Sequence, residues 1–384
     1  MEKAIPVVAR MAVAEAATFR VLVCDDQPDV LEALRLLAKG EGWQAVTVDS
    51  PDAVLRAARR EAFDLILVDL NYTRDTTSGA EGMDLLASLE AQGNRAPVMV
   101  MTAWSSFELA VEAMRRGACD FIQKPWDNQR LVAAIRKQTE AERRHKSELE
   151  IAASVQQKLF PGEPRRLGTL DYDAHCVPAR EVGGDYYDFL DTGEHDLGVI
   201  VADISGKGVP AALLMANLQA CFRSHPASEL REPVSLLAGI NRQFYESSEP
   251  ERFATMFYGL YDGGTRKLRY VNCAHPTPLL RRASGAVERL QPTATVVGAF
   301  PRWGCSAAEV ELRSGDTLAI YSDGVTEAAG AGDEEFGEER LLRVLEAHRS
   351  GPATAVVRAV VDGVAEFSGG ARSDDVTVVV LRAV

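Results

Sequence analysis

Asp203 follows an apolar run and opens a turn with two glycines, an arrangement in which a carboxylate can bind a metal ion. The run 197–202 predicts a buried strand. Gly206 and Gly208 allow a tight turn, which leaves the main-chain carbonyl of Ile204 free to bind beside Asp203. Such turns are also common without any ligand, so the assignment depends on what else the chain supplies.

Three further acidic motifs in the second half of the chain stand at predicted strand ends or turns. They contain Asp185, Asp323 and Asp374. Carboxylate and carbonyl oxygens, without a neighbouring Cys or His, are typical of a site for Mg²⁺ or Mn²⁺ rather than Zn²⁺. The four motifs together predict a hard-cation site.

Polar residues also end the predicted strands of the first half: Asp25, Asp26, Asp69, Thr102 and Lys124. Continuous apolar runs that alternate with helical periods predict a parallel sheet covered on both faces, with functional residues at the carboxyl ends of its strands. Carboxylates that converge there repel one another unless a cation lies among them, so Mg²⁺ is expected. Asp69 then becomes a nucleophile toward a phosphoryl group, and Lys124 and Thr102 stabilise the added charge.

With these five positions, residues 20–126 resemble a two-component receiver domain. The resemblance implies a flavodoxin-like α/β fold with a five-stranded parallel sheet, and a histidine kinase as the partner that donates phosphate. It also implies that Asp25, Asp26 and Asp69 bind Mg²⁺ and that Asp69 accepts the phosphoryl group. Lys124 would be the invariant lysine, Thr102 the switch hydroxyl and Phe121 the switch aromatic residue. One departure is the loop 71–80, which is about five residues longer than usual.

Residues 127–162 predict a helical linker, which Pro161 and Gly162 end. Steps of four and three residues follow the seam spacing of a two-stranded coiled coil. The seam positions are Leu131, Ile135, Gln138, Glu142, His145, Leu149, Ala152, Gln156 and Leu159. Because the middle of this seam is polar, we interpret the linker as a marginal, phosphorylation-sensitive dimer helix. A solvated helix between domains is the alternative.

Residues 163–384 predict an α+β arrangement of short strands and apolar helices. Their acidic motifs and the segment 272–280 resemble the metal-dependent PPM (protein phosphatase 2C-like) Ser/Thr phosphatases of the bacterial SpoIIE/RsbU type. The resemblance implies a β-sandwich flanked by helices and a site for two Mg²⁺ or Mn²⁺ ions. It assigns the ligands as follows: Asp203 bridges both ions, the Ile204 carbonyl binds one, Asp323 and Asp374 bind the other, and Asp185 contacts the site directly or through water. Such a site supplies a water nucleophile for in-line attack on a phosphoryl group.

Other positions of the second half have roles that the carboxylate motifs do not define. Arg180 stands where eukaryotic relatives carry a phosphate-binding arginine, although an ordinary surface arginine is the alternative. Ser205 replaces the histidine that is often proposed as general acid. We interpret His275 as structural, because hard metals seldom recruit a lone histidine. Asp375 is expected to orient Asp374 rather than to bind metal.

Composition limits the classes of function. The 42 basic and 56 acidic residues give a net charge of −14, which disfavours a nucleic acid or an anionic membrane as partner. Residues 1–19 contain no signal-peptide core and read as a flexible extension. Six cysteines without a CxxC pair are typical of reduced thiols in a cytoplasmic protein.

The sequence therefore predicts a response regulator whose output is metal-dependent dephosphorylation of phosphoserine or phosphothreonine in a protein, controlled at Asp69. By resemblance, the substrate is a phosphorylated anti-sigma-factor antagonist. The leading alternative is an inactive phosphatase fold that binds a sigma factor or adaptor. Retention of the four carboxylates argues against it, since a scaffold has no use for carboxylates that repel one another without metal. A transcription factor is disfavoured because the second half has no basic recognition helix.

Overall fold

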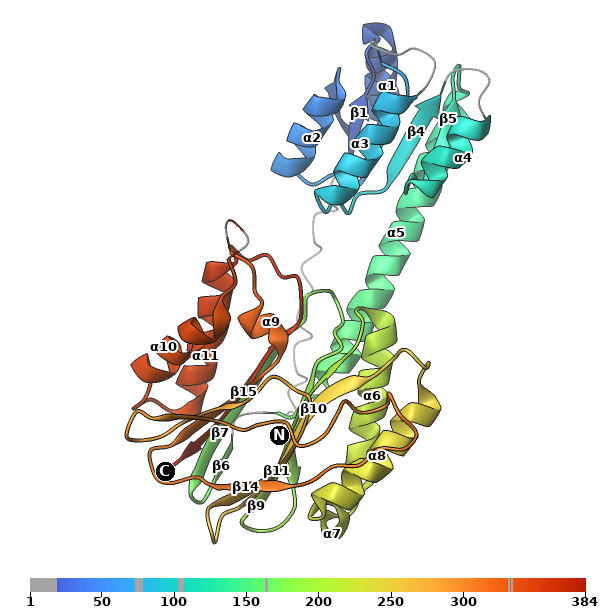
Figure 1. Ribbon diagram of the computed structural model, residues 1–384. Coiled ribbons are helices and arrows are strands. Elements are labelled where there is room, and N and C mark those ends of the chain that lie inside the picture. The colour runs from blue at the N-terminus through green and yellow to red at the C-terminus, as the bar shows by residue number, and fades with distance from the viewer. Residues whose placement is uncertain (1–18, 73–78, 103–106, 163–164, 331, 333) are drawn as a thin grey trace, which may run out of the picture. The chain divides into compact units, whose positions relative to one another are not determined.

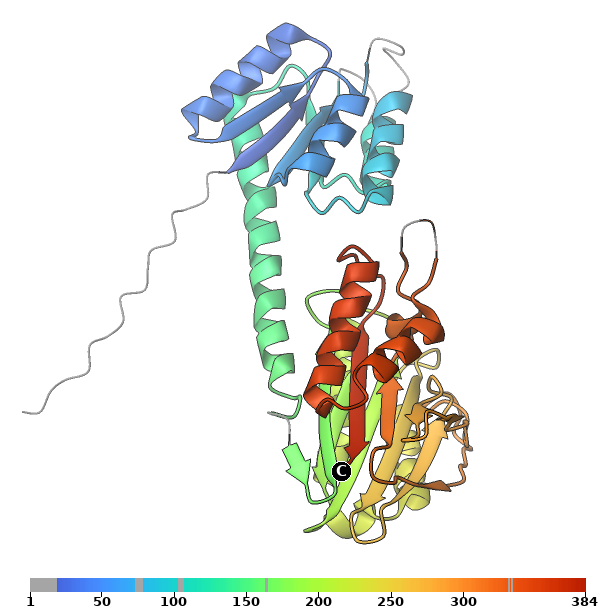
Figure 2. The same ribbon diagram turned by 90° about the vertical axis from the view of Figure 1, so that its left-hand side faces the viewer.

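The computed structural model describes residues 19–72, 79–102, 107–162, 165–330, 332 and 334–384, and Figures 1 and 2 show its helices and strands. The chain forms two compact units, Met1–Ser147 and Glu148–Val384, which are taken separately below. Within the described parts of the chain, no helix is long and apolar enough to cross a membrane.

The N-terminal unit contains a parallel five-stranded sheet in the order β2-β1-β3-β4-β5. Its strands are β1 (Arg20–Cys24), β2 (Gln44–Val48), β3 (Leu65–Asp69), β4 (Val98–Thr102) and β5 (Asp120–Gln123). The helices are α1 (Pro28–Gly40), α2 (Pro51–Arg60), α3 (Ala80–Ala91), α4 (Phe107–Arg115) and α5 (Asn128–Gln157). The α/β fold predicted for this half is confirmed.

Both faces of this sheet are buried, which explains the continuous apolar runs of its strands. Val21 and Val23 of β1 pack in one core with α1 and α5, and Leu22 and Cys24 pack in the other with α2, α3 and α4. The strand order reverses direction between β1 and β3, so the carboxyl ends of these two strands border the crevice where open α/β sheets bind ligands.

The C-terminal unit contains two antiparallel sheets, as the α+β prediction requires. The first has the order β14-β11-β10-β9-β8 and the second β13-β12-β15-β16-β7-β6. The first sheet consists of β8 (Tyr186–Asp191), β9 (Asp196–Ile204), β10 (Ala254–Asp262), β11 (Lys267–Cys273) and β14 (Ala308–Glu311). The second consists of β6 (Arg165–Leu167), β7 (Leu170–Val177), β12 (Leu279–Arg281), β13 (Val287–Arg289), β15 (Thr317–Tyr321) and β16 (Val376–Ala383).

Helices cover the outer faces of the two sheets (Figure 1). The first sheet packs against α6 (Val209–Ser224), α7 (Ala227–Leu230) and α8 (Pro233–Ser247). The second packs against α9 (Asp323–Thr326), α10 (Gly337–Ala347) and α11 (Ala353–Phe367). A third apolar cluster fills the space between the sheets, so the unit is a β-sandwich flanked by helices.

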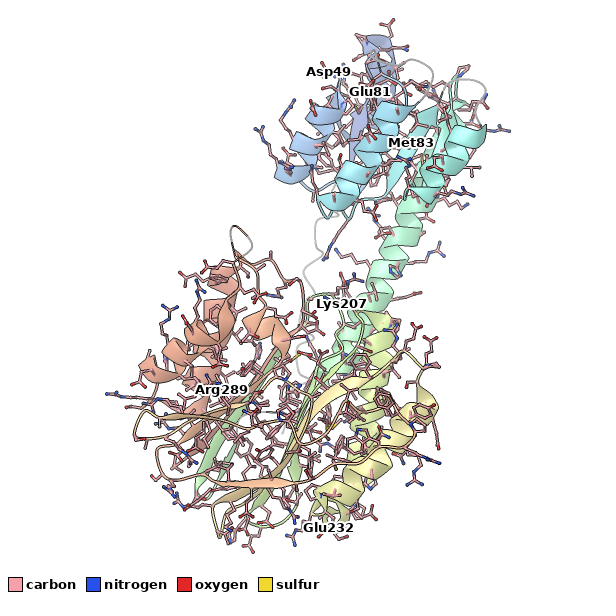
Figure 3. All side chains as sticks on the ribbon, viewed as in Figure 1. Asp49, Glu81, Met83, Lys207, Glu232 and Arg289 are labelled. Carbon is pink, nitrogen blue, oxygen red and sulfur yellow. The ribbon has the colours of Figure 1, made fainter. Side chains whose placement is uncertain are left out.

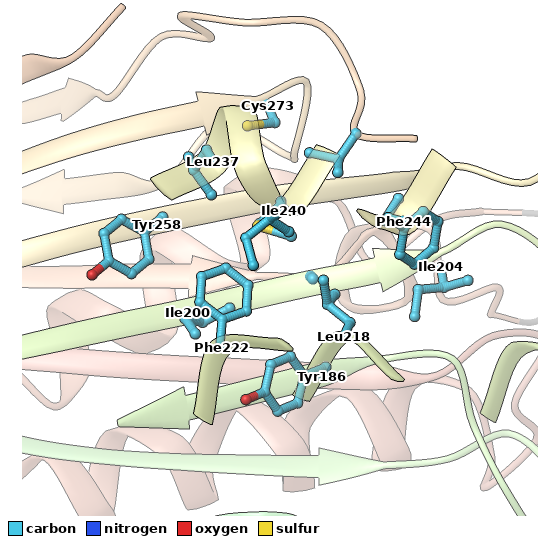
Figure 4. Packing of buried hydrophobic residues seen from close by; sticks show 14 of the residues in the cluster. Tyr186, Ile200, Ile204, Leu218, Phe222, Leu237, Ile240, Phe244, Tyr258 and Cys273 are labelled. Atoms are coloured by element: carbon cyan, nitrogen blue, oxygen red, sulfur yellow. The ribbon is translucent and has the colours of Figure 1, made fainter. Parts of the chain in front are cut away.

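Strand β9 shows how this layering positions Asp203. Ile200 and Ile204 point toward the helices, where they pack with Phe222 of α6 and Ile240 of α8 (Figure 4). Residues 199 and 201, on either side of Ile200, pack between the sheets. Because side chains alternate along a strand, Asp203 belongs to the face turned toward the second sheet.

Several positions of the predicted coiled-coil seam pack within the two units instead of facing a second helix. Leu131 and Ile135 lie in the core of the N-terminal unit, and Leu159 packs against a core of the C-terminal unit. Gln138 and Gln156 also make hydrogen bonds inside their own units. The spacing that suggests a seam is therefore used at both ends for intramolecular packing, since a buried helix face and a coiled coil share nearly the same period.

Candidate metal centres

The sheet of the N-terminal unit brings its three predicted carboxylates together. Asp25 and Asp26 follow β1 and Asp69 ends β3, and one oxygen of each lies within 4.8 Å of the others. The Lys124 Nζ donates hydrogen bonds to Asp25 Oδ2 at 2.6 Å and to Asp69 Oδ2 at 2.5 Å. Three carboxylates at this spacing with a single lysine match the oxygen ligands of a hard divalent cation.

The electrostatics of this cluster reflect its burial. Burial raises the pKa of Asp69, and the hydrogen bond from Lys124 only partly offsets the rise. Burial opposes the charge of Lys124, but the hydrogen bonds to Asp25 and Asp69 outweigh it and raise the pKa of the ammonium group. Lys124 therefore stays charged beside Asp69, where it can neutralise an added phosphoryl group.

The remaining predicted receiver residues lie near this cluster or at the surface. Thr102 ends β4 and is buried, while the Phe121 ring is 39% exposed. Most of the lengthened loop, residues 73–78, lies outside the described residues. Gly82 packs so closely against Leu70 that a methyl group would come within 2.6 Å of the Leu70 Cα.

In the C-terminal unit, four predicted carboxylates come from both sheets. Asp203 belongs to β9 and Asp185 directly precedes β8, whereas Asp323 starts α9 and Asp374 precedes β16. Burial raises the pKa of Asp203 to about 7, and the carboxylates of Asp323 and Asp374 add to the rise. Burial likewise raises the pKa of Asp185, with Asp203 adding to it, and that of Asp323, with Asp374 adding to it. The four carboxylates are thus close enough to repel one another.

Two local features indicate that this cluster suits metal ions. Asp185 Oδ2 is buried and has no hydrogen-bond partner among the described residues. Gly184 approaches the Ile204 carbonyl so closely that a methyl group would come within 2.9 Å of the oxygen. An unsatisfied buried carboxylate oxygen is costly, and a divalent cation bound by Asp185, Asp203 and the Ile204 carbonyl would remove that cost. No three carboxylates in the described part of this unit come within 4.8 Å, a wider spacing than in the N-terminal cluster.

Lys207 is a site residue that the sequence reasoning missed. It lies on the turn between β9 and α6 and is labelled in Figure 3. Its Nζ lies 2.8 Å from Asp374 Oδ2 and donates to the Ser373 carbonyl at 2.6 Å. The only sequence signal was its place between Gly206 and Gly208, in the motif that contains Asp203.

Asp375 contacts Asp374 through its backbone N–H, as an orienting role requires, but its carboxylate has a different task. Its carboxylate does not contact Asp374 but accepts hydrogen bonds from the backbone N–H groups of Ala179 and Gly184, each at 2.7 Å, and of Asp185 at 3.3 Å. The hydrogen bond to Asp374 Oδ1 comes from the backbone N–H of Asp375, at 2.9 Å. Asp375 therefore holds the segment that carries Asp185, because its carboxylate faces three backbone donors of that segment.

The remaining predicted positions of this unit have distinct surroundings. Arg180 is exposed, and no hydrogen bond or ion pair to it occurs among the described residues. Arg252, which the sequence reasoning did not single out, donates from Nη1 to the Ser205 carbonyl at 2.8 Å. Ser205 Oγ accepts the Phe253 N–H at 3.0 Å. His275 is buried and its Nδ1 lies 2.8 Å from Thr255 Oγ1, in accord with a structural role.

Comparisons with known proteins divide the chain at the same two units. Residues 21–136 match the family model described as response regulator receiver domain. Residues 193–384, half of the chain, match the model described as Stage II sporulation protein E (SpoIIE). The C-terminal unit also resembles the solved SiaA-PP2C domain of Pseudomonas aeruginosa, with a TM-score of 0.55 and 23% identity over 63% of this chain and 98% of that one. This structural likeness shows the fold.

Two relatives from Bacillus subtilis are similar to the chain. Phosphoserine phosphatase RsbU is 31% identical over 239 residues, which are 62% of this chain and 70% of RsbU. Phosphoserine phosphatase RsbP is 27% identical over 184 residues, which are 47% of this chain and only 45% of RsbP. The chain therefore belongs to the SpoIIE family and joins a response regulator receiver domain to a phosphatase domain of the PPM class.

Proposed function

We propose that this chain is a response regulator whose output is dephosphorylation of phosphoserine or phosphothreonine in a protein, under the control of phosphorylation at Asp69. The observation that carries the proposal is the carboxylate cluster of the C-terminal unit. There, Asp185 keeps an unsatisfied buried oxygen and the pKa of Asp203 is raised to about 7. Such a cluster is unfavourable unless cations bind to it.

The residues of this cluster have separate tasks in the proposed reaction. Two Mg²⁺ or Mn²⁺ ions, when bound, would supply an acidified water nucleophile and neutralise charge on the phosphoryl group. Asp203 and the Ile204 carbonyl would hold one ion, which Asp185 would contact directly or through water. Asp203, Asp323 and Asp374 would hold the other. Arg180, which lies on the exposed rim, is the proposed phosphate contact.

Regulation is proposed to start in the receiver domain. Asp25, Asp26 and Asp69 would hold one Mg²⁺, and a histidine kinase would transfer phosphate to Asp69. Lys124, which already contacts Asp69, would neutralise the added charge. The relatives RsbU and RsbP are named phosphoserine phosphatases, which supports a phosphoserine substrate. We further propose that this substrate is a phosphorylated anti-sigma-factor antagonist and that the chain forms a homodimer through α5.

The proposal is tested by Mn²⁺-dependent hydrolysis of a phosphoserine peptide. Wild type and Asp203→Ala are compared, each with and without beryllofluoride on the receiver. Metal-dependent turnover that is lost in Asp203→Ala supports the proposal, and the beryllofluoride ratio gives the sign of regulation.

A binding-only role is the second candidate, and the Lys207–Asp374 ion pair favours it, since it neutralises one carboxylate without metal. In the same assay, a wild-type protein that binds Mn²⁺ but turns over neither peptide nor captured phosphoprotein would support binding only.

A further inference from the structure

Gln156, in the last turn of α5, is bound to the backbone beside the metal centre of the C-terminal unit. Its Nε2 donates to the Gly183 carbonyl at 2.8 Å, and its Oε1 accepts the Gly183 N–H at 3.1 Å. The Gln156 side chain is buried, whereas its neighbour Gln157 is exposed. The side-chain amide of Gln156 thus satisfies both backbone hydrogen-bonding groups of Gly183, its N–H and its carbonyl.

The segment that Gln156 holds leads directly to Asp185. Gly183 and Gly184 have no side chains of their own to fix them, so their position depends on what binds their backbone. Asp375 binds the Gly184 and Asp185 N–H groups, and a methyl group on Gly183 would collide with the Asp375 carboxylate. The segment therefore lies between two buried polar side chains, one on α5 and one just before β16.

We propose that Gln156 is a positioning residue, which fixes the segment from Gly183 to Asp185 so that the Asp185 carboxylate is held ready for metal. This inference rests on the proposed function, because it assigns Asp185 to that metal centre. Without Gln156, Gly183 regains backbone freedom and Asp185 pays an ordering cost each time metal binds. Loss of Gln156 therefore weakens metal binding and leaves the chemistry at saturating metal intact.

The same contact makes the metal centre sensitive to α5. The helix is continuous from Asn128 to Gln157. A shift of one residue along a helix turns a side chain by roughly 100° and moves it about 1.5 Å. Hydrogen bonds of ordinary length do not survive such a displacement. A rotation or shift of the last turn of α5 would thus release Gly183.

The test compares Gln156→Leu, which keeps the side-chain volume and removes both hydrogen bonds, with Gln157→Leu as a matched control on the same turn. Calorimetry measures Mn²⁺ binding to the metal-free full chain, and turnover of a phosphoserine peptide gives the Mn²⁺ half-saturation and kcat. Thermal unfolding confirms that each variant is folded. We expect Gln156→Leu to weaken Mn²⁺ binding and raise the half-saturation about tenfold, the loss expected from two hydrogen bonds. Its kcat at saturating Mn²⁺ should match wild type, and Gln157→Leu should match wild type throughout.

Three outcomes would overturn the inference. Wild-type Mn²⁺ affinity in Gln156→Leu removes the positioning role alone, because wild-type binding and turnover leave the proposed function standing. A lower kcat and melting temperature with unchanged half-saturation marks a merely structural glutamine. Absence of Mn²⁺ binding in the wild type overturns the inference together with the proposed metal centre.

Discussion

Lys207 contacts Asp374, so it would compete with a metal ion at the proposed metal centre. The Nζ lies 2.8 Å from Asp374 Oδ2, and both side chains are more than a third exposed, so the pair is partly screened by water. A divalent cation on Asp374 would displace this ammonium group or be repelled by it. The lysine therefore lowers the repulsion within the carboxylate cluster, and it would raise the free-energy cost of metal binding.

Replacing Lys207 with methionine should tighten Mn²⁺ binding by about two- to fivefold, since an exposed ion pair contributes at most about 1 kcal/mol. Calorimetric titration of the metal-free full chain measures the change. Lys267→Met is the matched control, because Lys267 forms an exposed ion pair with Glu309 at 2.6 Å and its loss changes net charge equally. Weaker binding in Lys207→Met would show instead that the lysine holds the site in shape.

The raised pKa of Asp203 predicts how the metal-free protein responds to pH. Folding raises this pKa from 3.8 to about 7. Between these two pH values, the folded chain therefore keeps a proton on Asp203 that the unfolded chain has released. The stability contributed by this proton is fully present below about pH 4 and is lost as pH rises through about 7. In EDTA, the wild type should therefore lose stability between pH 5 and pH 8, whereas Asp203→Asn, which has no proton to release, should not. The resulting gain of Asp203→Asn relative to wild type is a few kcal/mol at most, at about 1.4 kcal/mol per pKa unit.

Thermal unfolding of both proteins at the two pH values measures this gain, and saturating Mn²⁺ should reverse it by stabilising only the wild type. A stability difference that does not change with pH would mean that Asp203 is ionised in the metal-free protein.

Local pattern predicted the strands and helices that carry the carboxylates, but not the contacts between distant segments. Apolar runs and strand ends gave the positions of Asp69 and Asp203, because these depend on a few neighbouring residues. Asp375 and Gly184 are 191 positions apart and meet only through the packing of two sheets. Gln156 was assigned to a coiled-coil seam because its period fits a buried helix face equally well. No spacing rule relates Gln156 to Gly183.

Helix α5 retains an exposed apolar strip that the predicted seam did not include. Ile151 and Val155 lie one turn apart and are 61% and 55% exposed, whereas Leu131 and Ile135 of the same helix are buried. Apolar side chains at this spacing form one face of a helix, and such a face is typical of helix pairing. We place the proposed dimer contact on Ile151 and Val155 rather than along the whole seam.

The double change Ile151→Glu with Val155→Glu should convert a dimer to a monomer. It removes the apolar side chains that the dimer contact would bury, and it places like charges opposite each other across the helix pair. Molar mass from sedimentation or light scattering measures this. Val234→Glu on α8 is the control, since Val234 is 44% exposed and lies on another helix. A wild-type monomer at all concentrations, or an unchanged mass in the double variant, would exclude this contact.

Both units contain a partly buried carboxylate cluster with a lysine that partly neutralises it. Lys124 contacts Asp25 and Asp69 in the receiver, and Lys207 contacts Asp374 in the phosphatase. Each cluster can be altered by one added charge, a phosphoryl group in the first and a metal ion in the second. Helix α5 belongs to both units, so a change in its position is the simplest link between them.

Phosphorylation of Asp69 should therefore change the Mn²⁺ requirement of the phosphatase. We expect beryllofluoride to shift the Mn²⁺ half-saturation of wild-type turnover by about fivefold or more, because coupling free energies between linked sites are typically about 1–3 kcal/mol. A downward shift marks activation and an upward shift inhibition.

Asp69→Asn should lose both the shift and labelling by acetyl phosphate, while its Mn²⁺-dependent turnover without beryllofluoride persists. Labelling that survives in Asp69→Asn would place the acceptor elsewhere, and an unchanged half-saturation in wild type would mean that the receiver does not act on the metal centre.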